Sequence, residues 1–120
     1  MAKEKKGGSE EWYMHFDPSK KLDDIQVIEI VREISRFGEI IYSFHVKQRM
    51  IERGYTNPDI IYILKHGRII KKEFNQDRQN WKYTFQCEDM DGTPGAVVTA
   101  ILDHRTILLV TVLGGTEKNE

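Results

Sequence analysis

The segment from Phe44 to Gly54 carries the residues best suited to chemistry. His45, Arg49 and Arg53 follow one another at four-residue spacing, which places all three on one ridge of a helix. Arginine binds phosphate oxygens through its planar guanidinium, and histidine can accept or donate a proton near neutral pH. This ridge therefore suits a phosphate group, which the arginines could bind while the histidine transfers a proton. The alternative is an amphipathic helix with a basic exposed face, in which Glu52 pairs with Arg49.

Local signals define the helix that must position this ridge. Ser43 is a candidate N-cap, and Gly54 is a typical C-terminal stop. The opposite half of the helix carries the apolar side chains that we expect to face the core: Phe44, Val46, Met50 and Ile51.

Two further helices are predicted on either side of this one. Asp17 and Pro18 signal the start of a helix over residues 18–37, ended by Gly38 as a left-handed cap. Its apolar stripe comprises Ile25, Ile28, Val31, Ile34 and Phe37. The other helix covers residues 58–66, with Thr56 or Asn57 as its cap and Gly67 at its end. It is almost wholly apolar and should be largely buried.

The second half of the chain has the period and the turns of β-structure. Strands are predicted over residues 68–74, 81–88, 95–102 and 106–113, paired as an antiparallel sheet in sequence order. The last two are nearly continuous apolar runs, which indicates cover on both faces. Glu39–Tyr42 is a candidate fifth strand at an edge. The predicted core residues are Ile60, Ile63, Leu64, Val98, Ile101, Leu108 and Val110.

The fold prediction is therefore α+β: an N-terminal helix and two further helices packed on a four-stranded or five-stranded antiparallel sheet. Residues 12–114 form the single domain, and residues 1–11 and 115–120 are expected to be a disordered tail and a flexible tail. Trp12, Tyr13 and Phe16 should dock on the domain, because they are too aromatic for a free tail.

Composition and charge place broad limits on function. No apolar run reaches the length of about 20 residues that a membrane span needs. A single cysteine, Cys87, excludes an internal disulfide and fits a reducing, cytoplasmic compartment. The net charge of −1 is unevenly distributed, because residues 40–86 hold 9 Lys and Arg against 4 Asp and Glu. That basic middle segment can attract phosphates, although a mixed solvated surface gives the same count.

An ordered set of short motifs carries a family resemblance over residues 43–113. These motifs are His45-x-x-x-Arg49-Met50-x-Glu52-Arg53-Gly54-Tyr55, Asp59-Ile60, Leu64, Gly67-Arg68-Ile69 and Ile107-Leu108-Leu109-Val110-Thr111-Val112. Together they resemble the domain of unknown function 4258 family, which is grouped with small bacterial toxins of the RelE and BrnT type. The residues that match the family motif are His45, Arg49, Glu52, Arg53, Gly67 and Thr111.

The resemblance implies a RelE-like fold and a protein that interacts with RNA. The most specific function that it implies is that of a metal-independent endoribonuclease toxin. His45, Arg49 and Arg53 would then be catalytic, and Lys72, Lys82 and Tyr83 would line the RNA groove from the sheet. RNA and a small acidic antitoxin-like protein are the implied partners, and no cofactor is required. Such toxins are usually strongly basic, whereas this chain is slightly acidic.

Other readings stay open. The basic ridge could instead engage an acidic protein without catalysis, or the chain could form a homodimer through a strand edge with no ligand. Trp81 and Tyr83 could stack on bases, but aromatic residues at alternating strand positions are more often part of the core. His15, His66, His104 and Cys87 lack the spacing of zinc ligands, so no metal site is predicted.

Overall fold

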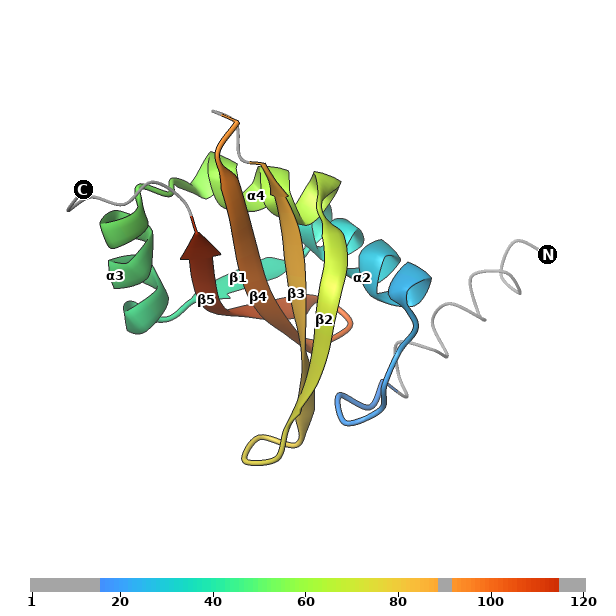
Figure 1. Cartoon of the computed structure of the whole chain (residues 1–120). Helices are drawn as coiled ribbons and strands as arrows, with labels where there is room; N and C mark the ends of the chain where they lie inside the picture. Colours follow the sequence, from blue (N-terminus) through green and yellow to red (C-terminus); the bar gives the residue numbers. More distant parts are fainter. Residues whose placement is uncertain (1–15, 89–91, 115–120) are drawn as a thin grey trace.

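The computed structural model describes residues 16–88 and 92–114, and it contains three helices and a five-stranded sheet (Figure 1). The α+β class predicted from the sequence is confirmed. The predictions made for residues 1–11 and 115–120, and the docking of Trp12 and Tyr13, fall outside the described residues. Phe16 does pack against the core.

The helices are α2 (Asp24–Phe37), α3 (Phe44–Arg53) and α4 (Asn57–His66). The limits of α3 and α4 agree with the sequence prediction to within a residue, because strong local caps define both. Ser43 caps α3, and Thr56 caps α4 in a reciprocal capping box with Asp59.

The predicted start of the first helix is wrong. Asp17 accepts hydrogen bonds from the backbone and hydroxyl groups of Ser19 and forms a turn rather than a helix start. The helix begins after Asp23, whose side chain accepts from the Gln26 N–H while the Gln26 side chain accepts from the Asp23 N–H. A complete capping box satisfies two orphan N–H groups and therefore overrides the Asp-Pro signal.

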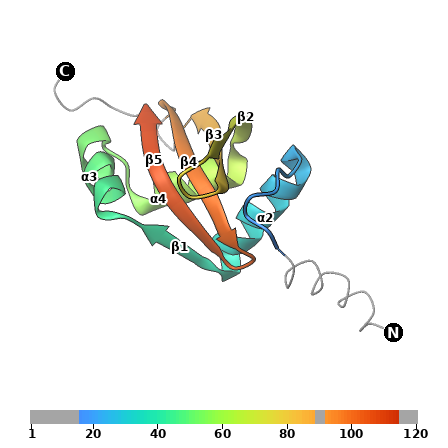
Figure 2. The same cartoon turned by 90° about the horizontal axis from the view of Figure 1, so that it is seen from below.

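The strands are β1 (Glu39–Tyr42), β2 (Arg68–Asn75), β3 (Asn80–Glu88), β4 (Pro94–Asp103) and β5 (Thr106–Gly114). Their spatial order is β1-β5-β4-β3-β2, so strands β2 to β5 form the antiparallel meander expected from the short connections. The fifth strand is real, but β1 pairs with β5 in parallel, so the sheet is mixed rather than wholly antiparallel. Figure 2 shows β1 beside β5, with α3 following it.

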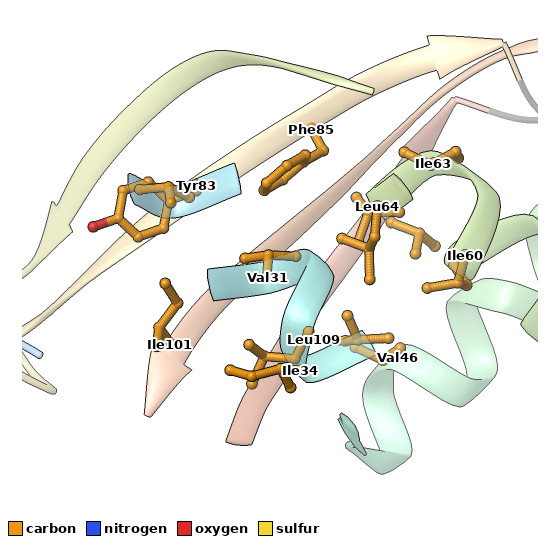
Figure 3. Packing of buried hydrophobic residues seen from close by; sticks show 14 of the residues in the cluster. Val31, Ile34, Val46, Ile60, Ile63, Leu64, Tyr83, Phe85, Ile101 and Leu109 are labelled. Carbon is orange, nitrogen blue, oxygen red and sulfur yellow. The ribbon is translucent and has the colours of Figure 1, made fainter. Parts of the chain in front are cut away.

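The helices and one face of the sheet enclose a single core. In Figure 1, α2 and α4 lie behind the sheet and α3 stands beside β5. Figure 3 shows side chains from all three helices meeting those of the strands: Val31, Ile34, Val46, Ile60, Ile63, Leu64, Tyr83, Phe85, Ile101 and Leu109. Within the described residues, no helix packs on the opposite face, which we call the open face.

This one-sided cover corrects the prediction that the last two strands are buried on both faces. Ile107, Leu109 and Val112 of β5 are buried, whereas Leu108 and Val110 lie on the open face and are only partly buried. The other five predicted core residues are buried. The central strand β4 is buried along most of its length, because neighbouring strands flank it and its open-face residues, such as Ala96 and Ala100, are small.

Two details of α2 also differ from the prediction. Ile25 and Phe37 at its ends are exposed, and the buried residues are Val27, Val31 and Ile34. Gly38 is extended rather than left-handed. It is a glycine for steric reasons, because a Cβ there would collide with the carbonyl oxygen of Arg105.

Candidate functional site

Helix α3 is a short, firmly terminated platform. The Ser43 hydroxyl accepts a hydrogen bond from the Val46 N–H at 3.1 Å and fixes the first turn. Gly54 adopts the left-handed conformation (φ 76°), and its N–H bonds back to the last turn of the helix. Both ends of the helix are therefore set by the sequence itself, and the side chains between them have defined directions.

The sequence-predicted ridge lies beside the buried stripe of α3. Val46 and Met50 face the core, and His45, Arg49 and Arg53 follow one turn apart along the flank of that stripe. His45 is exposed, whereas Arg49 and Arg53 are partly buried. The three residues therefore lie on one ridge of the helix, and they are more buried at its C-terminal end than at its N-terminal end.

Arg53 is more than a surface residue. Its Nη1 donates a hydrogen bond to the Gly114 carbonyl oxygen at 3.2 Å, and the hydroxyl of nearby Tyr55 donates to the Leu113 carbonyl oxygen at 3.0 Å. The end of α3 is therefore tied to the end of β5. Arg53 is hydrogen-bonded and partly buried, so it is not a freely exposed residue of the basic face.

The opposite flank of α3 also departs from the prediction. Phe44 and Ile51, expected in the core, are exposed at 75% and 74%. Helical geometry explains this, since both lie on the side away from Val46 and Met50. Glu52 is exposed, and among the described residues no ion pair joins it to Arg49.

The three sheet residues predicted to line an RNA groove are not beside the ridge. Helix α3 packs on β5, whereas Lys72 and Lys82 belong to β2 and β3 on the other side of the sheet. Lys82 lies on the open face, and its Nζ is 3.8 Å from Glu73. No common groove therefore forms from these residues and α3.

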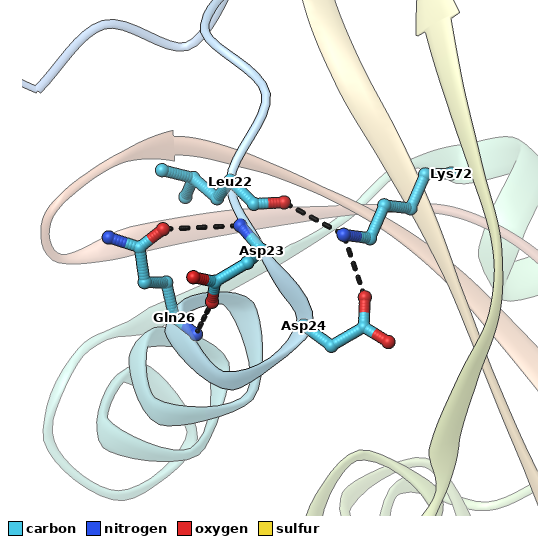
Figure 4. Close-up of polar contacts among 5 residues, drawn as sticks. All are labelled: Leu22, Asp23, Asp24, Gln26 and Lys72. Atoms are coloured by element: carbon cyan, nitrogen blue, oxygen red, sulfur yellow. Dashed lines mark hydrogen bonds and ion pairs between the residues drawn. The ribbon is translucent and has the colours of Figure 1, made fainter.

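Lys72 has a structural position (Figure 4). Its Nζ lies 2.7 Å from the Asp24 carboxylate and donates to the Leu22 carbonyl oxygen at 2.8 Å. Only 18% of its side chain is exposed. The contact ties the start of α2 to the sheet, so it accounts for Lys72 without RNA.

Tyr83 is a core residue, as its alternation with polar neighbours along the strand favours. It is 2% exposed, which leaves no ring face for a base. Burial raises the pKa of its phenol above the usual 10.0, and a backbone hydrogen bond from Leu22 opposes that shift. Tyr42 at the end of β1 has its pKa raised in the same direction, also by burial.

The remaining motif residues have distinct settings. Gly67 is buried where α4 meets β3, and a Cβ there would lie 3.1 Å from the Gln86 carbonyl oxygen. Thr111 lies on β5 opposite Val98, away from the core. Arg32, which sequence reasoning did not assign to the site, donates from α2 to the Gly67 carbonyl oxygen at 3.3 Å. No local sequence signal predicts that contact, because Arg32 and Gly67 are brought together only by helix packing.

Neither a metal-binding cluster nor a membrane-spanning helix is found over residues 16–88 and 92–114. In that part of the chain, no three His, Cys, Asp or Glu side chains gather closely enough to hold a metal ion. None of the helices there has the length and apolar character needed to cross a membrane.

Comparison with known families identifies the central and C-terminal part of the chain. The model of a family described as a domain of unknown function, DUF4258, matches residues 42–113. This range starts at the end of β1, includes α3 and α4, and ends in β5. No curated protein and no solved structure matches the chain.

Proposed function

The chain belongs to the DUF4258 family, and from that premise we propose that it is an RNA-interacting protein whose α3 ridge contacts the sugar–phosphate backbone. The observation that carries the proposal is the alignment of His45, Arg49 and Arg53 on one flank of a rigid, well-capped helix. Phosphate contacts by arginine supply much of the affinity of RNA-binding surfaces. The basic excess over residues 40–86 supports the same partner class.

The finer form of the proposal is a metal-independent endoribonuclease of the RelE and BrnT type. Arg49 and Arg53 would bind the scissile phosphate, with Arg53 oriented by its bond to the Gly114 carbonyl oxygen. His45 would act as general acid or base. As a base it takes the proton of the 2′-hydroxyl, whose oxygen attacks phosphorus. The 5′ oxygen then leaves with a proton from solvent, and a 2′,3′-cyclic phosphate remains.

One observation favours a second candidate, namely binding of an acidic partner protein by the same ridge without catalysis. Tyr83 is buried and Lys72 is paired with Asp24, so neither supplies the second wall of a catalytic groove. A ridge that binds anions without such a wall suits recognition better than cleavage.

The test compares RNA binding with stability. The full chain should bind a single-stranded RNA, and the affinity should fall as salt is added, because neutralised phosphates release counterions. Arg49→Ala should reduce the salt slope by about one unit and leave the melting temperature unchanged. Arg78→Ala is the matched control, since Arg78 is an exposed arginine in the β2–β3 turn. It should leave the slope unaltered.

Two further variants separate binding, catalysis and structure. His45→Ala should abolish cleavage and keep the binding affinity. Arg53→Ala should weaken RNA binding and also lower the free energy of unfolding by about 1–3 kcal/mol, because its bond to Gly114 is lost. Absence of RNA binding at low salt would refute the RNA proposal and leave the acidic protein partner as the better account.

A further inference from the structure

The outward side of α3 carries two large apolar side chains in line. Phe44 and Ile51 have the largest exposed fractions of all the large apolar residues described. They are seven residues apart, which places them on the same line of the helix about 10.5 Å apart. Lys47 and Gln48 lie one turn from each and are exposed. We call these four residues the outer ridge of α3.

The spacing of Phe44 and Ile51 suits contact with a second helix. Single exposed apolar residues are ordinary on protein surfaces. Two that lie seven residues apart share one line of the helix, where the apolar side chains of a single partner helix can cover both. The core does not need Phe44 and Ile51, because Val46 and Met50 already provide the buried stripe of α3.

Charge indicates the kind of helix that fits. Lys47 stands at the middle of the outer ridge, and no ion pair engages it within residues 16–88 and 92–114. Lys47 is the one charged residue of the outer ridge, and it lies between the two apolar anchors. A helix with acidic residues beside its own apolar side chains would therefore place an opposite charge next to Lys47.

The same charge disfavours a second copy of the chain. Two outer ridges placed face to face would bring Lys47 of one copy close to Lys47 of the other, which is repulsive. RNA would leave Ile51 unused, because an isoleucine side chain offers a phosphate no donor and a base no ring face.

We propose that the outer ridge of α3 docks an acidic amphipathic helix of another protein, with Phe44 and Ile51 as apolar anchors and Lys47 as the charged contact. The outer ridge lies on the other flank of α3 from His45, Arg49 and Arg53. The proposal therefore does not depend on the RNA-binding proposal, and the two can be disrupted separately.

The test uses the full chain and two synthetic helices of three heptads, both with leucine at a and d. One carries glutamate at e and g, and the other carries lysine there. Calorimetry should show binding of the glutamate helix only. The double variant Phe44→Ser, Ile51→Ser should lose at least about tenfold in affinity. Lys47→Glu should weaken binding of the glutamate helix and create affinity for the lysine helix.

The matched control is Ile25→Ser, which removes an exposed apolar residue (69% exposed) from α2 and should leave the affinity unchanged. All variants should keep the wild-type melting temperature, because their side chains face solvent. Equal binding of the two helices, no binding, or an equal loss in Ile25→Ser would overturn the proposal. The proposal would also be overturned if the wild type is a dimer and the double variant a monomer, or if the double variant loses affinity for RNA.

Discussion

The ionisation of Tyr83 makes the stability of the folded chain depend on pH. The buried phenol has its pKa raised above 10.0, so the folded chain holds the proton more tightly than the unfolded chain does. The stabilisation is complete below pH 10.0. It is lost as the pH rises from that value through the folded pKa, because the unfolded chain releases the proton first.

Tyr83→Phe should reduce this alkaline loss of stability. Phenylalanine fills nearly the same volume but has no proton to release, so its melting temperature should fall less between about pH 9 and pH 11 than that of the wild type. Thermal melts at several pH values measure the difference, with Tyr62→Phe as the control at a tyrosine that is 37% exposed. Parallel curves for Tyr83→Phe and the wild type would contradict the argument.

Helix α3 and the sheet meet at an unusually close contact. Tyr55 follows the helix, and its hydroxyl bonds to β5 while its ring lies against Gly95 of β4, where a Cβ would collide with that hydroxyl. Gly95→Ala should therefore lower the free energy of unfolding by about 1–3 kcal/mol. In a Tyr55→Phe background the same substitution should be less costly, because the colliding oxygen is gone. Urea unfolding of the wild type, the two single variants and the double variant measures the coupling free energy between the two positions. Additive changes in the free energy of unfolding would count against the contact.

The elements differ in how far the sequence could predict them. Ser43 and Gly54 act locally, so the limits of α3 were predictable. The exposure of Phe44 and Ile51 was not, because the side of a helix that packs is decided by its neighbours in the fold. The parallel pairing of β1 likewise depends on β5, which is distant in sequence. For the candidate site, the helical ridge follows from its spacing alone, whereas the positions of Lys72 and Tyr83 follow from the order of the strands.

At the scale of the whole molecule, the helices described in residues 16–88 and 92–114 cover only one face of the sheet, and adjacent residues of β5 should reveal this. Leu109 is fully buried beneath the helices, so Leu109→Asp should unfold the domain, since an unpaired buried charge is destabilising by several kcal/mol. Val110→Asp should leave a folded protein with a smaller loss, because Val110 is on the open face. Circular dichroism melts distinguish the two, and equal loss of structure would mean that the open face is covered.

The position of β1 also bears on the order in which the chain folds. Its neighbour in the sheet is β5, and residues 43–105 separate the two strands. The three hairpin contacts of β2 to β5 are local and close small loops, whereas docking β1 closes a loop that contains most of the domain. Strand β1 is made early in the chain, but it cannot pair until β5, the last strand, has formed. The docking of β1 is therefore conditional on the folding of the C-terminal half of the domain.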